Sequence, residues 1–155
     1  MDCKKISDSK CEGVYLVLSQ HINGSGRLFG GILLQWIDTV GAVVARRHSG
    51  CEVTTASIDN LQFVKPVTIN STVVIKGYLT YVGHTSMEVC VETYTEDMGG
   101  QTNLVNKAYL VFVAMKDGRP TPVPGLLLES EKEIMENENG CKRQELRRHR
   151  RAANY

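Results

Sequence analysis

The segment that most constrains the fold is an almost uninterrupted apolar stretch over residues 28–45. Its apolar side chains recur at i, i+3 and i+4 and predict a helix over about residues 29–47, ended by Gly50. A helix that is apolar on nearly every side must be enclosed by the rest of the chain. Because a central carboxylate, Asp38, is costly in lipid, we expect a buried core helix and no membrane span.

The strand-like segments of the chain are expected to enclose this helix. Three of them follow one another with short Gly-containing turns, which is typical of an antiparallel meander. The chain has 155 residues, which suits one domain. We therefore predict an α+β fold, an antiparallel β-sheet wrapped around one long central α-helix. The predicted strands cover residues 14–19, 53–63, 72–82, 86–95 and 102–115.

The net charge of +1 hides an uneven distribution. Residues 1–128 are neutral, whereas the C-terminal segment is first acidic and then basic. We expect residues 1–128 to form the functional domain and residues 129–155 to form a charged extension, helical or flexible. Ser130 and Glu133 have the spacing of a helix capping box. Such a helix can pair head-to-tail with itself or with a neighbouring subunit; otherwise the segment is a mobile end.

The cysteines and histidines show no metal-binding spacing. The five cysteines are widely separated, without a Cys-x-x-Cys motif, which favours free thiols in a reducing compartment. The polar N-terminus lacks the apolar region of a secretory signal, so we expect a cytoplasmic protein. Each of the four histidines fits a surface or turn position better than a metal ligand, and Cys90 fits a structural role.

Asp38 is the residue that least fits its surroundings. An ionised carboxylate is almost never buried without a partner. The helical neighbours Gly41, Ala42 and Ala45 are small, which predicts a gap beside the acid and hence a reactive pocket. The alternative is that the helix has one solvent face and that Asp38 lies on it. The pattern alone leaves both open.

A glycine-rich segment, residues 23–31, leads into the helix. Free N–H groups at a helix N-terminus favour an anion or an oxyanion. The glycine spacing matches neither a dinucleotide fingerprint nor a P-loop, and Gly24-Ser25-Gly26 is not a nucleophile elbow. The alternative is an ordinary flexible loop that lets the helix pack closely at Gly30 and Gly31.

The segment as a whole resembles the helix-entry motif of hotdog-fold acyl-CoA thioesterases, in the cytosolic acyl-CoA hydrolase branch with its YciA-like bacterial enzymes. The resemblance covers about residues 12–125 and continues through residues 45–48, 53–59 and 83–88. Phe29 stands where many members have His, as in the bacterial branch. The motif reads Asn23-x-x-Gly26-x-Leu28-Phe29-Gly30-Gly31-x-Leu33-Leu34-x-Trp36-Ile37-Asp38-x-x-Gly41.

This resemblance implies the sheet-wrapped helix described above and a catalytic site at a dimer interface. It implies a homo-oligomer built from dimers, as a trimer of dimers. Asp38 would act as general base on water, or as a nucleophile that forms a mixed anhydride. Asn23 from the partner subunit would orient water or substrate. The backbone N–H groups of Gly30 and Gly31 would receive the thioester carbonyl.

The resemblance also implies where the substrate would lie. No cofactor is required, and coenzyme A is expected only as a part of the substrate and as a product. The acyl chain would lie beside Asp38, near Leu34, Gly41, Ala42 and Ala45. Basic and hydrogen-bond-donating groups would line the path of the CoA phosphates. These candidates are Gly83, His84, Thr85, Ser86, Arg46, Arg47 and Lys107.

Three other functions compete with hydrolysis. A non-catalytic, regulatory acyl-CoA-binding protein of this fold would lack the acid or carry a DNA-binding module, and the chain has Asp38. A dehydratase of this fold needs a paired His, and none is suitably placed. A nucleic-acid or membrane-surface binder would act through the basic tail. The neutral body gives no reason to expect nucleic acid or membrane as a partner.

Overall fold

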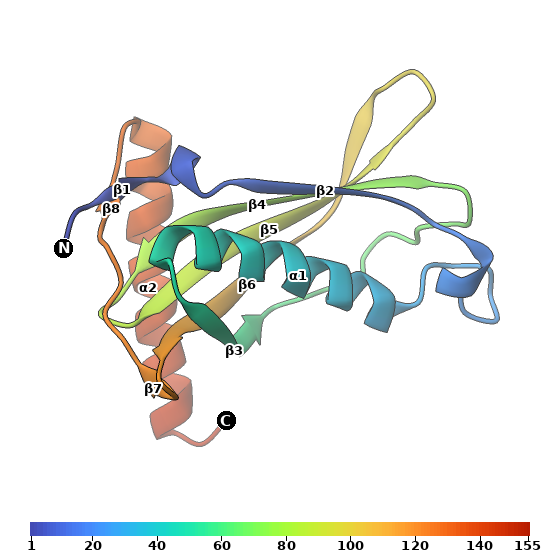
Figure 1. The fold of residues 1–155 in the computed structure, drawn as a ribbon. Coiled ribbons are helices and arrows are strands. Elements are labelled where there is room, and N and C mark those ends of the chain that lie inside the picture. The colour runs from blue at the N-terminus through green and yellow to red at the C-terminus, as the bar shows by residue number, and fades with distance from the viewer.

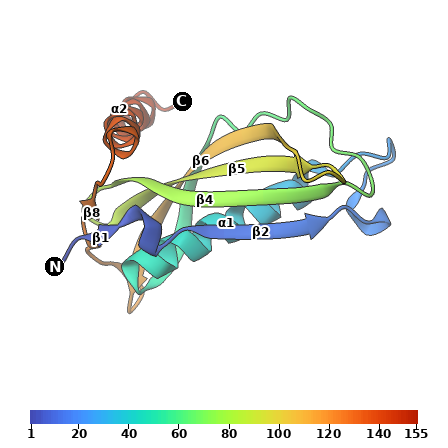
Figure 2. The ribbon, with the colours of Figure 1, turned by 90° about the horizontal axis from the view of Figure 1, so that it is seen from above.

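The computed structural model describes residues 1–155 and has two α-helices on opposite sides of one curled antiparallel sheet (Figure 1, Figure 2). The strands of this sheet lie side by side in the order β2-β4-β5-β6-β3, and β7 pairs with the end of β6. A separate parallel pair, β1 and β8, joins segments near both ends of the chain. In chain order, the elements are β1 (Lys4–Lys5), η1 (Ile6–Asp8), β2 (Cys11–Leu16), η2 (Ser19–His21), α1 (Gly30–Ser49), β3 (Glu52–Asp59), β4 (Thr72–Val82), β5 (Ser86–Glu96), β6 (Thr102–Lys116), β7 (Arg119–Pro120), β8 (Leu126–Leu127) and α2 (Glu131–Ala152).

Helix α1 fills the concave face of the sheet, as the apolar pattern predicts. Its buried side chains join inward-facing residues of the strands in one hydrophobic cluster of 21 residues. The helix approaches the sheet closely at Gly41, where a Cβ would lie 3.0 Å from the Phe112 ring. The helix ends at Gly50, whose φ of 68° is left-handed and whose N–H donates to the Arg46 carbonyl. The predicted α+β architecture, an antiparallel sheet wrapped around one long helix, is confirmed.

The bounds of the central strands also agree with the sequence, whereas both edge strands differ from it. The predicted strand over residues 53–63 ends at Asp59, because Asn60 has a φ of 49° and leaves the extended conformation. The predicted strand over residues 14–19 lies earlier, at Cys11–Leu16. Leu16 is paired with Thr72, the first residue of β4, so no partner strand continues beyond it.

Helix α2 begins where the capping residues predict. The Ser130 hydroxyl accepts a hydrogen bond from the Glu133 N–H, and the Glu133 carboxylate accepts one from the Glu129 N–H. The charged segment was expected to pair with a copy of itself, with a neighbouring subunit or to be a mobile end. It is a helix that crosses the outer face of its own sheet, opposite α1 (Figure 2), and its pairing with another subunit stays a prediction. As a result, the outward-facing side chains Glu88 and Cys90 are buried.

His48 contradicts the expectation that every histidine lies at the surface or in a turn. It is fully buried at the end of α1, where its Nε2 lies 2.7 Å from the Pro124 carbonyl oxygen. Burial lowers the pKa of His48, against the opposing effect of this hydrogen bond. The chain after β7 covers the end of α1, which the local sequence pattern could not indicate. Neither helix is long and apolar enough to cross a membrane.

Candidate active site

Asp38 lies half-buried on α1, at the border between the face on the sheet and a face open in the single chain. Its Oδ1 accepts a hydrogen bond of 2.8 Å from the Thr55 hydroxyl on β3. Gln35, one turn before Asp38, and the adjacent Thr39 are exposed, so α1 has a solvent face in the single chain and Asp38 lies at its edge. A carboxylate held by one hydroxyl keeps its second oxygen free to accept another proton donor.

The predicted gap beside Asp38 is not formed by Gly41 and Ala45 within one chain. The space at Gly41 is filled, since the Phe112 ring and a Val91 methyl group would lie 3.0 and 3.5 Å from its Cβ. Ala45 is fully buried in the core. Of the small residues, Ala42 is the one that remains half-buried. Room for an acyl chain next to Asp38 therefore has to come from the open side of α1.

Asn23 is held by the loop that precedes α1. Its Oδ1 accepts hydrogen bonds from the N–H groups of Ser25 and Arg27, at 2.9 and 3.3 Å. Its own N–H donates to the Arg27 carbonyl and closes the turn. Because the side-chain carbonyl is occupied, the Nδ2 amide group is left exposed as a donor.

The first turn of α1 offers two more donors. The N–H groups of Gly30 and Gly31 find no acceptor in the chain, as is usual at a helix start, and Phe29 provides no side-chain cap. The positive end of the helix dipole adds to their attraction for an oxyanion. Asn23 and Gly30 both line an open pocket of about 350 Å³ beside Phe63. Donors thus gather at this end of the helix.

The chain does not bring this donor group to Asp38. Asp38 lies eight positions after Gly30 on α1, which is about 12 Å along the axis. Asp38 is not among the residues that line the pocket at Asn23. The acid of one chain and the donors of the same chain therefore lie in different places on α1.

The residues predicted to bind coenzyme A lie in three places, on α1, in the turn between β4 and β5, and on β6. Arg46 and Arg47 are exposed in the last turn of α1, and residues 83–86 form the turn between β4 and β5. In that turn Gly83 N–H donates to the Ser86 carbonyl, and Ala114 N–H donates to the Thr85 carbonyl. Lys107 lies apart, because it faces Glu92 on the outer side of the sheet, which separates it from Asp38.

Thr55 is the functional candidate that the sequence did not single out. It stands in the quoted match over residues 53–59 without an assigned role. The only signal was a pair of adjacent threonines in a strand that directly follows the helix. No group of three or more His, Cys, Asp or Glu side chains in the chain could hold a metal ion.

Comparison with known proteins gives consistent matches. A family model described as thioesterase superfamily matches residues 25–101. The uncharacterized acyl-CoA thioester hydrolase YkhA of Bacillus subtilis is 36% identical over 146 residues, which cover 93% of this chain and 85% of that protein.

Solved structures extend these matches to the whole fold. The acyl-CoA hydrolase of Staphylococcus aureus, solved with butyryl-CoA, CoA and CoA disulfide, is 34% identical with a TM-score of 0.92, over 98% of this chain and 94% of that one. An apo-hexameric acyl-CoA thioesterase is 32% identical with a TM-score of 0.92, over 98% and 99% of the two chains. The S. aureus enzyme has also been solved with single alanine replacements of an Asn, an Asp and a Thr.

Proposed function

This chain belongs to the thioesterase superfamily, and we propose that it hydrolyses an acyl-CoA thioester to a free carboxylic acid and coenzyme A. Water supplies the oxygen that bonds to the acyl carbon, and the carbon–sulfur bond breaks to release the CoA thiol. The observation that carries this proposal is the half-buried Asp38 carboxylate held at 2.8 Å by Thr55. The activities named for its relatives support the same reaction.

The spacing of three residues supports these assignments. In the S. aureus hydrolase, the residues replaced by alanine are an Asn, then an Asp 15 residues later, then a Thr 17 residues after that. Asn23, Asp38 and Thr55 follow one another at the same intervals in this chain. Asp38 and Thr55, which are in contact here, therefore match in type and spacing two of the three residues that were replaced in that relative.

Asp38 would activate the attack on the thioester carbonyl. With Oδ1 occupied by the Thr55 hydroxyl, Oδ2 is available to take a proton from water. The same oxygen could instead attack the acyl carbon and form a mixed anhydride that water then hydrolyses. In both routes Thr55 fixes the carboxylate in one orientation. This lowers the entropic cost of reaching the reactive geometry.

Gly30 and Gly31 would stabilise the negative charge that develops on the carbonyl oxygen, and Asn23 would orient water or substrate beside them. Asn23 has its Nδ2 free, and the two glycine N–H groups have no acceptor in the chain. Preorganised donors of this kind lower the barrier to acyl transfer. Because Asn23 lies far from Asp38 of the same chain, we assign the Asn23 of a complete site to the partner subunit.

This arrangement requires an oligomer, and we propose a homo-oligomer built from dimers, as a trimer of dimers. The hexameric form of the relative supports this stoichiometry. The apolar side chains Phe29, Phe63 and Val64 are exposed near the start of α1, where a second subunit would cover them. We expect the protein to work in the cytoplasm, without a metal or other cofactor and without nucleic acid or membrane as partners.

The turn at residues 83–86 and the exposed Arg46 and Arg47 are our candidates for contacts with coenzyme A. The turn offers hydroxyl and N–H donors, and the arginines offer positive charge for phosphate. Lys107 would reach the nucleotide only from the outer side of the sheet. Residues 1–128 hold every group to which we assign chemistry, and residues 129–155 hold none.

A thiol-release assay over a series of acyl-CoA chain lengths tests the proposal. We expect turnover by the wild type and its loss in Asp38→Ala, with the oligomer intact by size-exclusion chromatography. Tight binding of acyl-CoA without turnover by the wild type would favour the non-catalytic binding protein. Retained kcat in Asp38→Ala would contradict the role of this carboxylate.

A further inference from the structure

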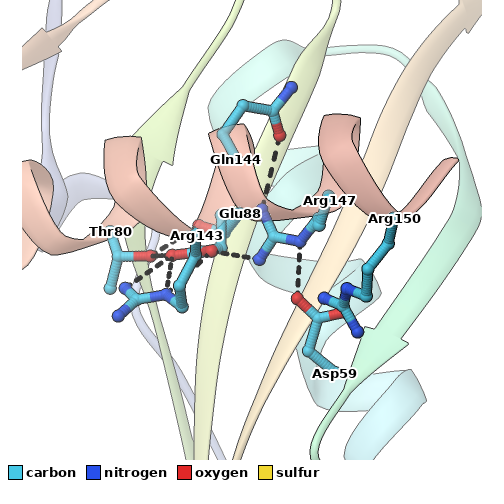
Figure 3. Close-up of polar contacts among 7 residues, drawn as sticks. All are labelled: Asp59, Thr80, Glu88, Arg143, Gln144, Arg147 and Arg150. Atoms are coloured by element: carbon cyan, nitrogen blue, oxygen red, sulfur yellow. Dashed lines mark hydrogen bonds and ion pairs between the residues drawn. The ribbon is translucent and has the colours of Figure 1, made fainter. Parts of the chain in front are cut away.

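The outer face of the sheet contains two buried carboxylates that the proposed reaction does not use. Glu88 on β5 is 2% exposed and Asp59 at the end of β3 is 7% exposed. Both point away from α1 toward α2, which brings arginines to meet them (Figure 3). We call Glu88, Asp59, Arg143 and Arg147 the arginine latch. Buried charges persist only when paired, so these contacts fix how α2 sits on the sheet.

Arg147 joins the two carboxylates. Its Nε donates to Asp59 Oδ2 at 2.5 Å, and its Nη2 donates to Glu88 Oε2. The Arg147 side chain is itself buried. One guanidinium therefore ties a strand at the edge of the sheet to a strand in its centre.

The two carboxylates depend on Arg147 to different degrees. Glu88 also receives three hydrogen bonds of 2.8–3.1 Å from Arg143 and one from the Thr80 hydroxyl. Asp59 has only one other partner, the half-exposed Arg150 at 3.5 Å. Loss of Arg147 would thus leave Asp59 with only the half-exposed Arg150 while leaving Glu88 well paired.

Asp59 is the last residue of β3, the strand that carries Thr55. Within the chain β3 pairs with β6 alone, and this pairing has an irregularity between Thr55 and Ser57. Beyond Asp59 the chain leaves the sheet at Asn60. The backbone pairing with β6 continues to Asp59, and the ion pair with Arg147 adds a side-chain anchor at this end of β3.

We propose that Arg147 is a positioning residue for the reaction. By holding Asp59, it sets where β3 lies and so where the Thr55 hydroxyl meets Asp38. This proposal rests on the proposed thioesterase function and adds α2 to the groups that determine its rate. It acts through Thr55, because Arg147 and Asp38 are on opposite sides of the sheet.

Arg143→Met is a matched control for Arg147→Met. Each variant removes one latch arginine, but only Arg147→Met releases Asp59. We expect Arg147→Met to lower kcat on the order of 10-fold with little change in KM, since small misplacements of reacting groups cost this much or more. Arg143→Met should stay within about 2-fold of wild type, as its partner lies on β5. Equal kcat in both variants would overturn the proposal.

A double-mutant cycle with Thr55→Val shows whether the effect passes through Thr55. In the Thr55→Val background, Arg147→Met should lower kcat no further, because the hydroxyl that it positions is gone. Independent, multiplying losses would overturn the proposal. If Arg147→Met does not fold, Asp59→Asn breaks the same link from the strand and is expected to give the same cycle.

Hydrogen exchange separates failure of this proposal from failure of the proposed function. Amides of residues 52–59 should exchange faster in Arg147→Met than in Arg143→Met, whether or not the protein hydrolyses acyl-CoA. If the wild type has no thioesterase activity, the proposed function fails and the exchange result decides whether the latch anchors β3. Equal exchange of β3 in both variants would overturn the anchor itself.

Discussion

At the scale of single residues, the contact between Asp38 and Thr55 yields the sharpest prediction. Thr55→Val removes the hydroxyl bonded to Oδ1 and leaves a half-buried carboxylate free to rotate. We expect kcat for acyl-CoA hydrolysis to fall roughly 10-fold or more. Thr55→Ser keeps a hydroxyl and should recover most of the rate. Steady-state kinetics on both variants checks this, and a Thr55→Val enzyme with wild-type kcat would refute it.

Glu88 predicts how stability depends on pH. Burial alone would raise the pKa of Glu88, but hydrogen bonds from Arg143, Thr80 and Arg147 hold it below its ordinary value of 4.5. The folded state therefore binds this proton less well than the unfolded state does. The stabilisation is complete above the ordinary pKa of a Glu and is lost as pH falls through the lower, folded value.

Glu88→Gln should therefore be less stable than wild type near neutral pH, and the difference should shrink in acid. Chemical unfolding of both proteins at several values between about pH 7 and about pH 3 measures it. A difference in the free energy of unfolding that stays constant over this range would show that the charge of Glu88 contributes nothing.

The sequence could identify Asp38 but not the residues that hold or surround it. A carboxylate in an apolar helix violates a strong pattern and so attracts attention. A threonine in a strand violates none, and which of Thr54 and Thr55 meets α1 depends on register with β6. The alternating pattern of β5 correctly predicted that Glu88 points to the outer face of the sheet. It could not show that α2 buries that face.

At the scale of elements, Gly140 lets α2 lie close to the sheet. A Cβ at this position would lie 2.6 Å from the Tyr81 Cβ and 3.1 Å from Glu88 Oε1. Gly→Ala in a helix normally stabilises by about 1 kcal/mol. Here we expect Gly140→Ala to destabilise by roughly 1–3 kcal/mol, because the helix must move away from its partners.

Thermal or urea unfolding measures this effect, with the exposed Glu138→Ala as the control on the same helix. The control should stay within about 0.5 kcal/mol of wild type. If Gly140→Ala were more stable than wild type, the close packing of α2 on the sheet would be wrong.

Elements with strong periodic patterns were the most predictable. The spacing of apolar residues located α1, and alternation located β4 and β5 within a residue or so of their ends. The edge strand β3 ended early, because Asn60 has a positive φ that the alternating pattern does not indicate. The capping residues predicted the start of α2, but its docking depends on Glu88 and Asp59, which are distant in sequence.

At the scale of the whole molecule, we propose that one chain does not make a complete site, because Asn23 lines a pocket that Asp38 does not reach. The donors at the start of α1 lie about 12 Å along the helix from the acid. In a symmetric dimer each site would then take Asp38 from one chain and Asn23 from the other. Neither residue pattern nor composition carries this information; it rests on the family resemblance and stays a prediction.

The most direct test of the shared catalytic site mixes two inactive variants, Asn23→Ala and Asp38→Ala, by joint refolding or coexpression. Each variant alone should hydrolyse acyl-CoA far more slowly than wild type. A hybrid dimer has one site with both native residues, so an equal mixture should recover about a quarter of wild-type activity. A mixture that forms hybrid oligomers yet stays as inactive as its components would contradict a site that combines Asp38 of one subunit with Asn23 of the other.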